Sequence, residues 1–238
     1  FSKISTNATE TYLRKRTEER ISRYNEQYQK LSEAKADSKE LKSEVKEFSK
    51  NEEKDREERK KNTSLTEWDY IREGNACFNN KEYEKALEAY AKALELDPEY
   101  VYAYNGRGNA YQALGEYEKA VSDYDRAIGL DPEYVIGYYN RGNAYQAMGK
   151  YEEALADYSK ALELDPKYEY AYNNRGNTYD SMGDYEKAIA DYTQAIQINP
   201  GEALYYQNRA KTYRKLGDAE KAEADEQKAK EIKELEQK

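Results

Sequence analysis

The sequence contains no histidine, and Cys77 is its only cysteine. One cysteine cannot form a disulfide within the chain, and the usual Cys and His sets that bind zinc cannot assemble. The residue that most often serves as a general base is also missing. We therefore expect no enzyme: no catalytic residues, no metal site and no cofactor. Cys77 itself is interpreted as a small buried packing residue.

Long hydrophobic runs are missing as well. No segment approaches the roughly 20 apolar residues that a helix needs to cross a bilayer, and no signal peptide is visible. We expect no membrane insertion and a cytoplasmic location. Because the sequence begins with Phe1 rather than Met, an upstream targeting segment that is not included is the alternative.

Positive charge is scarce after residue 64. Residues 1–64 carry 17 Lys and Arg against 14 Asp and Glu, whereas the rest of the chain carries 22 against 34. The first part is therefore basic, at about +3, and the second acidic, at about −12. An acidic body repels a polyanion before any specific contact forms, so we expect no nucleic acid partner.

What the sequence has in abundance is a repeat. Arg-Gly-Asn-Ala-Tyr at residues 107–111 recurs at 141–145, and Arg-Gly-Asn-Thr-Tyr follows at 175–179, a period of 34 residues. Residues 101–134 and 135–168 are identical at 20 of 34 positions, so the period is not accidental. A fixed period of this length predicts a solenoid of stacked modules, which presents an extended surface. The predicted units are 67–100, 101–134, 135–168, 169–202 and a divergent unit, 203–236.

Each unit reads as two helices joined by a tight turn. In the second unit Gly115 supplies a positive φ that ends the first helix, and Pro132 follows the second. Small residues recur where the two helices face each other, with tyrosines around them. The last unit lacks the closing proline, and its second helix is expected to continue as a capping helix.

These residues resemble the tetratricopeptide repeat family, whose pattern of Trp, Leu-Gly, Tyr, Ala, Phe and Pro has the same period. The resemblance covers residues 67 to about 229, with Tyr at the Trp and Phe positions and Arg at the Leu position. It implies an all-α, right-handed superhelical solenoid in which the first helices line a concave groove. The repeat domain is predicted at 65–238, with a capping box of Ser64 and Glu67 at its start.

Residues 1–64 do not fit the repeat and are predicted to form a charged arm of two helices. One apolar stripe contains Ile21, Tyr24, Tyr28 and Leu31, at spacings of three and four. Three roles stay open: the arm caps the first repeat, pairs with other copies of the chain as a short coiled coil, or docks into a neighbour's groove.

An asparagine ladder is the candidate binding site. Helical spacing places unit positions 6 and 9 on the face that the family uses for its groove. The asparagines there are Asn75, Asn109, Asn140, Asn143, Asn174, Asn177 and Asn208. Each amide offers a donor and an acceptor to the backbone of an extended peptide. Alternatively, the amides bond to the neighbouring repeat and hold the superhelix in register; both roles are compatible.

Aromatic residues on the same face are predicted to receive apolar side chains of a ligand. They are Trp68, Phe78, Tyr102, Tyr139 and Tyr170. A row of arginines, Arg107, Arg141, Arg175 and Arg209, recurs with the same period as Asp123, Asp157 and Asp191. We interpret this row as intramolecular ion pairs rather than an anion site. The basic residues Lys211, Arg214 and Lys215 are a weaker candidate contact for an acidic ligand residue.

Together these patterns predict a protein–protein interaction scaffold that binds an extended peptide or a helix of an unidentified partner in its groove. The alternative is a structural assembly protein, a homo-oligomer that self-associates through the arm and the repeats. The near identity of the units also fits a designed or chimeric repeat protein, which need have no natural partner.

Overall fold

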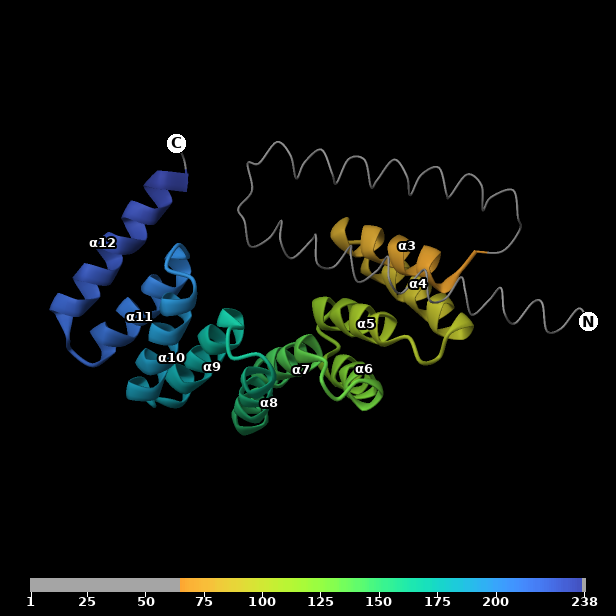
Figure 1. Cartoon of the computed structure of the whole chain (residues 1–238), viewed down its shortest axis with the longest axis horizontal. Helices are drawn as coiled ribbons and strands as arrows, with labels where there is room; N and C mark the ends of the chain where they lie inside the picture. Colours follow the sequence, from red (N-terminus) through yellow and green to blue (C-terminus); the bar gives the residue numbers. More distant parts are fainter. Residues whose placement is uncertain (1–64, 237–238) are drawn as a thin grey trace, which may run out of the picture. The chain divides into compact units, whose positions relative to one another are not determined.

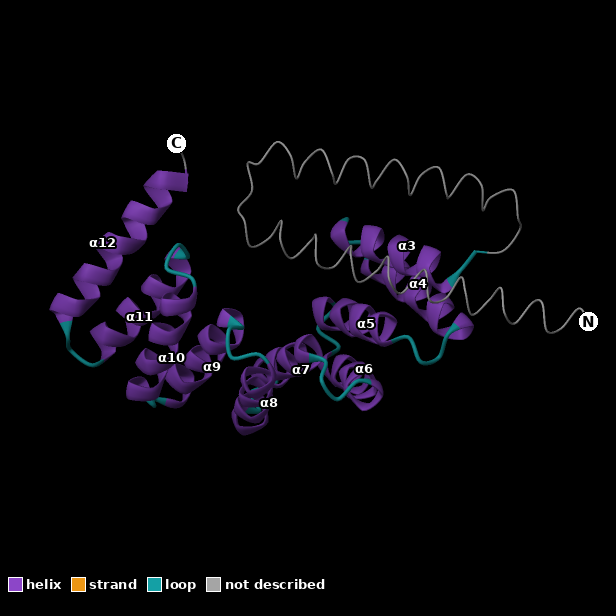
Figure 2. Ribbon diagram, in the orientation of Figure 1, coloured by secondary structure: helices purple, strands orange, loops and turns teal. Residues whose placement is uncertain are grey.

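The computed structural model describes residues 65–236, and this part of the chain contains ten α-helices and no strand (Figures 1 and 2). By its contacts the chain divides into two units, Phe1–Asp69 and Tyr70–Lys238. The predictions made for residues 1–64, including their helices, lie outside the described residues. The boundary predicted between residues 64 and 65 stays a prediction.

The helices alternate between two kinds. We call α3, α5, α7, α9 and α11 the first helices and the others the second helices. Their bounds are α3 Glu67–Asn79, α4 Tyr83–Leu96, α5 Val101–Ala113, α6 Tyr117–Leu130, α7 Val135–Ala147, α8 Tyr151–Leu164, α9 Glu169–Met182, α10 Tyr185–Ile198, α11 Ala203–Lys215 and α12 Ala219–Glu236. Helix α12 is the longest of them, as expected for a capping helix.

Packing in the second unit follows the chain order. From α4 to α12, each helix contacts the next, so the helices stack as a solenoid. Neighbouring first helices also contact one another, in the pairs α5 with α7, α7 with α9, and α9 with α11. No pair of second helices in the described part makes a comparable contact. The first helices are therefore drawn together on one side of the stack, which we call the first-helix face.

Turns between the two helices of a repeat require a left-handed residue. Gly115 has φ 78°, and Gly149, Gly183 and Gly217 adopt similar values, which confirms the expected turn. In the first repeat, Lys81 takes this conformation with φ 62°. Its amide nitrogen donates to Phe78 O, so the turn forms without glycine.

The start of the repeats differs from the prediction. The backbone nitrogen of Thr66 donates to Asp69 Oδ2, and Thr66 Oγ1 accepts from the Asp69 backbone nitrogen. This reciprocal pair is a capping box with aspartate in its third position, and it begins α3 at Glu67. The predicted box of Ser64 and Glu67 was wrong because Thr66 stands closer to the first helical turn and has a carboxylate three residues later.

Tyrosine and glycine form the contact between the two helices in the first four repeats. The Tyr124 ring is fully buried between α5 and α6, over Gly108. A Cβ atom on Gly108 would lie only 2.6 Å from Tyr124 Cε1. Tyr90, Tyr158 and Tyr192 repeat this arrangement over Gly74, Gly142 and Gly176. Buried alanines such as Ala120 and Ala127 complete the interface, so aromatic rings fill a thin core.

Arginine and aspartate form another contact between the two helices, in the second to fifth repeats. Arg107 binds Asp123 through two hydrogen bonds of 2.8 and 2.7 Å, and Asp123 is buried. The same bidentate pair recurs in the next three repeats, as Arg141 with Asp157, Arg175 with Asp191 and Arg209 with Asp225. The predicted row of intramolecular ion pairs is confirmed. Fork-to-fork geometry of this kind fixes the angle between the two helices.

Arginine also links each repeat to the one before it. Arg141 Nη1 donates to Asp125 Oδ1 of α6, Arg175 Nη1 to Ser159 Oγ of α8, and Arg209 Nη1 to Thr193 Oγ1 of α10. The hydrogen bonds to the aspartates raise the pKa of these guanidinium groups. Each arginine is thus held on the second-helix side and stays charged.

The contact between glycine and tyrosine generates a stability prediction. We expect Gly108→Ala to lower the free energy of unfolding by about 2 kcal/mol, because the new methyl group overlaps a buried ring that cannot move freely. Gly129→Ala in α6 is the matched control: open space surrounds a Cβ there. That change should raise stability by about 0.5–1 kcal/mol through helix propensity. Urea unfolding followed by circular dichroism compares the two. Equal effects of the two substitutions would contradict the tight contact.

Candidate functional site

The ladder asparagines at unit position 9 are bound to the second helices. The Tyr124 hydroxyl donates to Asn109 Oδ1 at 2.8 Å, and Tyr158 donates to Asn143 Oδ1 at the same distance. Tyr90 with Asn75 and Tyr192 with Asn177 repeat the bond. Burial raises the pKa of these tyrosines, so the hydroxyls remain neutral donors. The ring that fills the repeat therefore also fixes the position of one amide.

Asparagines at unit position 6 connect neighbouring first helices. Asn140 Nδ2 donates to Asn109 Oδ1 at 3.1 Å and to Asn105 Oδ1 at 2.9 Å. One repeat further, Asn174 Nδ2 donates to Asn143 Oδ1 at 2.8 Å and to the Tyr139 hydroxyl at 3.0 Å. Asn208 Nδ2 donates to Asn173 Oδ1. These bonds show that the amides hold successive repeats in register; a role towards a ligand stays a prediction.

The hydrogen bonds of the ladder determine which amide atoms remain available to a ligand. The oxygens of Asn109 and Asn143 each accept two hydrogen bonds from within the solenoid. The Nδ2 group of Asn109 bonds to none of residues 65–236, whereas that of Asn143 lies beside the Tyr139 hydroxyl; both side chains are half-buried. Asn140 has the opposite arrangement. Both hydrogens of its Nδ2 group are donated, and its oxygen has no partner among residues 65–236. The amides are thus held in fixed orientations, with donors at position 9 and an acceptor at position 6.

Three of the predicted aromatic residues lie together with tyrosines that the sequence analysis missed. The Tyr102 ring packs edge-on against Tyr100 and Tyr134. In the next repeats, the Tyr168 ring contacts both Tyr139 and Tyr170, at centroid distances of 5.1 and 5.8 Å. The missed residues, Tyr100, Tyr134 and Tyr168, end successive units, so their 34-residue recurrence was the available signal. We call these six rings the tyrosine band.

The other two predicted aromatics are not joined to this band. The half-buried Phe78 ring packs against Tyr83, at the start of α4. Trp68 is also half-buried, but it belongs to the first unit and has no defined place relative to the ladder. The prediction that these two residues anchor a ligand therefore gains no support.

Arg214 and Lys215 of the predicted basic cluster are paired within the chain. Lys215 Nζ donates to Asp180 Oδ2, and Arg214 binds Glu226 through two hydrogen bonds. Two members of the predicted basic cluster are therefore neutralised internally. Among residues 65–236, no three Cys, Asp or Glu side chains gather as a metal site requires. Cys77 is half-buried, not buried as predicted, because it lies near the end of α3.

Family models match most of the described chain. A tetratricopeptide repeat model matches residues 135–168 and 169–202, a second model of the repeat matches 74–115 and 108–149, and a third matches 191–224. The chain belongs to the tetratricopeptide repeat family. A function as a protein–protein interaction scaffold follows from this membership and from the solenoid. None of the described helices is both long and apolar enough to span a membrane.

Several solved tetratricopeptide repeat structures are similar to this chain. A crystal structure of MamA is 30% identical, with a TM-score of 0.61 over 69% of this chain and 90% of MamA. YrrB, described as a protein with an unusual peptide-binding site, is 29% identical, with a TM-score of 0.56 over 69% of this chain and 84% of YrrB. A thermophilic member from Thermus thermophilus is 25% identical, with a TM-score of 0.60 over 70% of this chain and 91% of that protein. No curated protein sequence matches the chain.

The bonds of the ladder predict a cost for removing an amide. We expect Asn143→Ala to lower the free energy of unfolding by about 1–3 kcal/mol, because the Tyr158 hydroxyl and Asn174 Nδ2 each lose one hydrogen bond. In a double-mutant cycle with Tyr158→Phe, the coupling energy should be about 0.5–1.5 kcal/mol. Thermal and urea unfolding supply the four values.

The control for this cycle is Asn79→Ala, at the exposed end of α3. Its effect should stay within about 0.5 kcal/mol. A coupling energy of zero between Asn143 and Tyr158 would show that the hydrogen bond does not support the repeat.

Proposed function

We propose that the first-helix face binds an extended peptide segment of a partner protein, through the amide ladder and the tyrosine band. The observation that carries the proposal is the fixed orientation of the amides. Asn109 and Asn143 direct their oxygens into the solenoid, which leaves their Nδ2 groups as donors. Donors that need no reorganisation suit the carbonyl groups of a peptide backbone, since binding then orders fewer side chains.

The acceptor of Asn140 complements these donors. An extended backbone presents both carbonyl and N–H groups, and a strand-like or polyproline-like segment has none of them bonded internally. The Asn140 oxygen, with no partner among residues 65–236, suits a backbone N–H. A bound α-helix has already satisfied its own backbone groups, so the ladder supports an extended peptide in preference to a helix.

The family supports the same kind of function. Tetratricopeptide repeat proteins are typically scaffolds without catalytic activity, and YrrB, similar to this chain, is described as having a peptide-binding site. Self-association through residues 1–64, the alternative expected from the sequence, finds no supporting observation in the described residues. The ladder is the feature on which we base the test.

A substitution that spares the fold separates binding from stability. In Asn109→Asp with Asn143→Asp, each new side chain keeps an oxygen for its tyrosine and its neighbouring asparagine but loses the outward donor. We expect the affinity for peptides selected from a random library on the unaltered full chain to fall about 10- to 100-fold, because two hydrogen bonds are replaced by repulsion from carbonyl groups. Fluorescence anisotropy measures this change, and circular dichroism checks the fold.

The matched control is Gln194→Glu on α10, an exposed position on a second helix. It introduces the same type of charge away from the first-helix face and should leave the affinity unchanged. If the double aspartate variant binds the selected peptides as well as the unaltered chain does, the ladder is not the binding site.

A further inference from the structure

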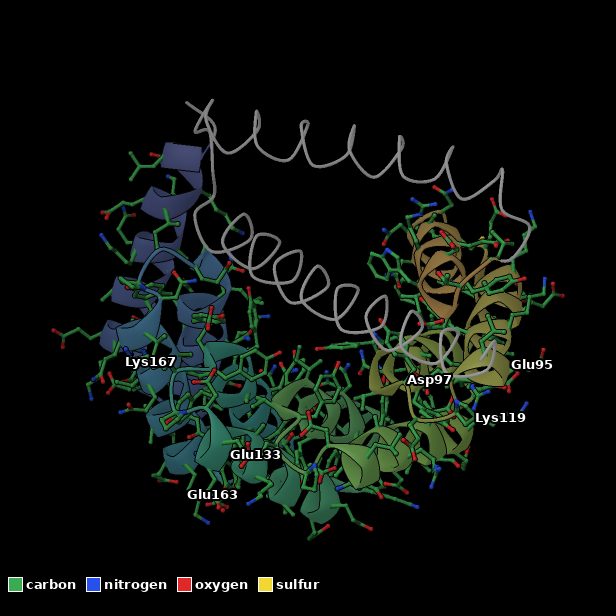
Figure 3. All side chains as sticks on the ribbon, turned by 45° about the vertical axis from the view of Figure 1, so that its right-hand side comes forward. Glu95, Asp97, Lys119, Glu133, Glu163 and Lys167 are labelled. Atoms are coloured by element: carbon green, nitrogen blue, oxygen red, sulfur yellow. The ribbon has the colours of Figure 1, made fainter. Side chains whose placement is uncertain are left out.

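Helices α5 and α7, in the middle of the first-helix face, carry no unpaired charge. Helices α5 and α7 each contain one charged residue, Arg107 and Arg141, and both are bound to aspartates of second helices. The six charged residues labelled in Figure 3 all belong to second helices or to the loops that follow them. A charged ligand residue on this face would lose water without gaining a partner. The face therefore favours an uncharged segment.

The tyrosine band gives this uncharged face its apolar surface. Tyr102 is 41% exposed and Tyr170 is 45% exposed, so both rings offer area to a ligand. The Tyr134 ring packs edge-on against Tyr102, and the Tyr168 ring packs edge-on against Tyr170. The ring centroids are 5.9 and 5.8 Å apart. Rigid rings of this kind contribute contact area at a low cost in side-chain entropy. Rows of aromatic rings beside hydrogen-bond donors are the usual surface for polyproline II segments.

The spacing of the repeats selects among ligand conformations. Packed helices in general lie about 8–10 Å apart, and the hydrogen bonds from Asn140 and Asn174 join neighbouring first helices. A polyproline II helix repeats every three residues, or about 9.3 Å. A β-strand presents the same side every second residue, about 6.6 Å, and an α-helix turns every 5.4 Å or so. Only the polyproline II period agrees with the repeat spacing.

We propose that the first-helix face binds an uncharged polyproline II segment with a proline at every third residue. Two of these prolines lie against the exposed Tyr102 and Tyr170, and carbonyl groups of the segment accept from Asn109 and Asn143. The two residues between prolines keep their N–H groups, one of which suits the Asn140 oxygen. This inference rests on the proposed function of the face and specifies its ligand class.

Synthetic peptides test the period directly. One labelled 12-residue peptide contains Pro-Ala-Gln four times, and a second has the same composition with its four prolines at every second residue. A third replaces each Gln of the first with Glu. By anisotropy with the full chain, we expect the first peptide to bind about tenfold or more tightly than either of the others. Equal affinities for the first two, or no binding of the first, would overturn the proposal.

Variants of the band test the site. We expect Tyr102→Ala with Tyr170→Ala to weaken binding of the Pro-Ala-Gln peptide by about tenfold. Both rings are exposed, so the fold should persist, and circular dichroism melting verifies that. Leu96→Ala at the end of α4, 53% exposed, removes apolar area from a second helix and should have no effect on binding. An unchanged affinity of the double tyrosine variant would also overturn the proposal.

The library selection separates this inference from the proposed function. One outcome is that the selected peptides need Asn109 and Asn143 for binding but lack the three-residue proline period, or carry charge in the middle of the segment. In that case the face binds peptides and the polyproline II inference is wrong. If no selected peptide depends on these asparagines, both proposals fail.

Discussion

The contact on which the rest of the structure depends is a tyrosine of the second helix placed over a glycine of the first, in four of the five repeats. In the second repeat the Tyr124 ring fills the space over Gly108, and its hydroxyl binds Asn109. A phenylalanine would fill the same volume but would remove one of the two hydrogen bonds that orient the amide. Tyrosine therefore links the packing of a repeat to the orientation of the polar group that it presents.

A second consequence is the separation of charge. In four repeats an arginine of the first helix binds an aspartate of the second helix, and neutral amides are left on the first-helix face. The acidic excess of the repeat body thus says little about the chemistry of that face. Net charge is a property of the whole surface, whereas recognition depends on the few groups that a ligand contacts.

The sequence predicted the helices, the left-handed glycine turns and the arginine–aspartate pairs, because each of these depends on local spacing or on residues of one repeat. It did not predict which end of each amide faces outward. That orientation depends on Tyr124 and on Asn140 of the next repeat, and an asparagine accepts either arrangement. The grouping of Tyr102 with Tyr134 was missed for a similar reason, since their contact joins the start of one unit to its end.

The pairing of a second-helix tyrosine with a position 9 asparagine also sets the length of the site. The fifth repeat has Ala210 in place of the packing glycine and Glu226 in place of the tyrosine, so no hydroxyl is available to orient an amide. Lys211 replaces the position 9 asparagine there, and Thr212 Oγ1 turns back to Asp180 of α9. Four repeats retain the tyrosine–asparagine pair. At about three extended residues per repeat, a segment of about 12 residues spans them. A longer ligand would gain no further amide oriented by a tyrosine, since the tyrosine–asparagine pairs end with the fourth repeat.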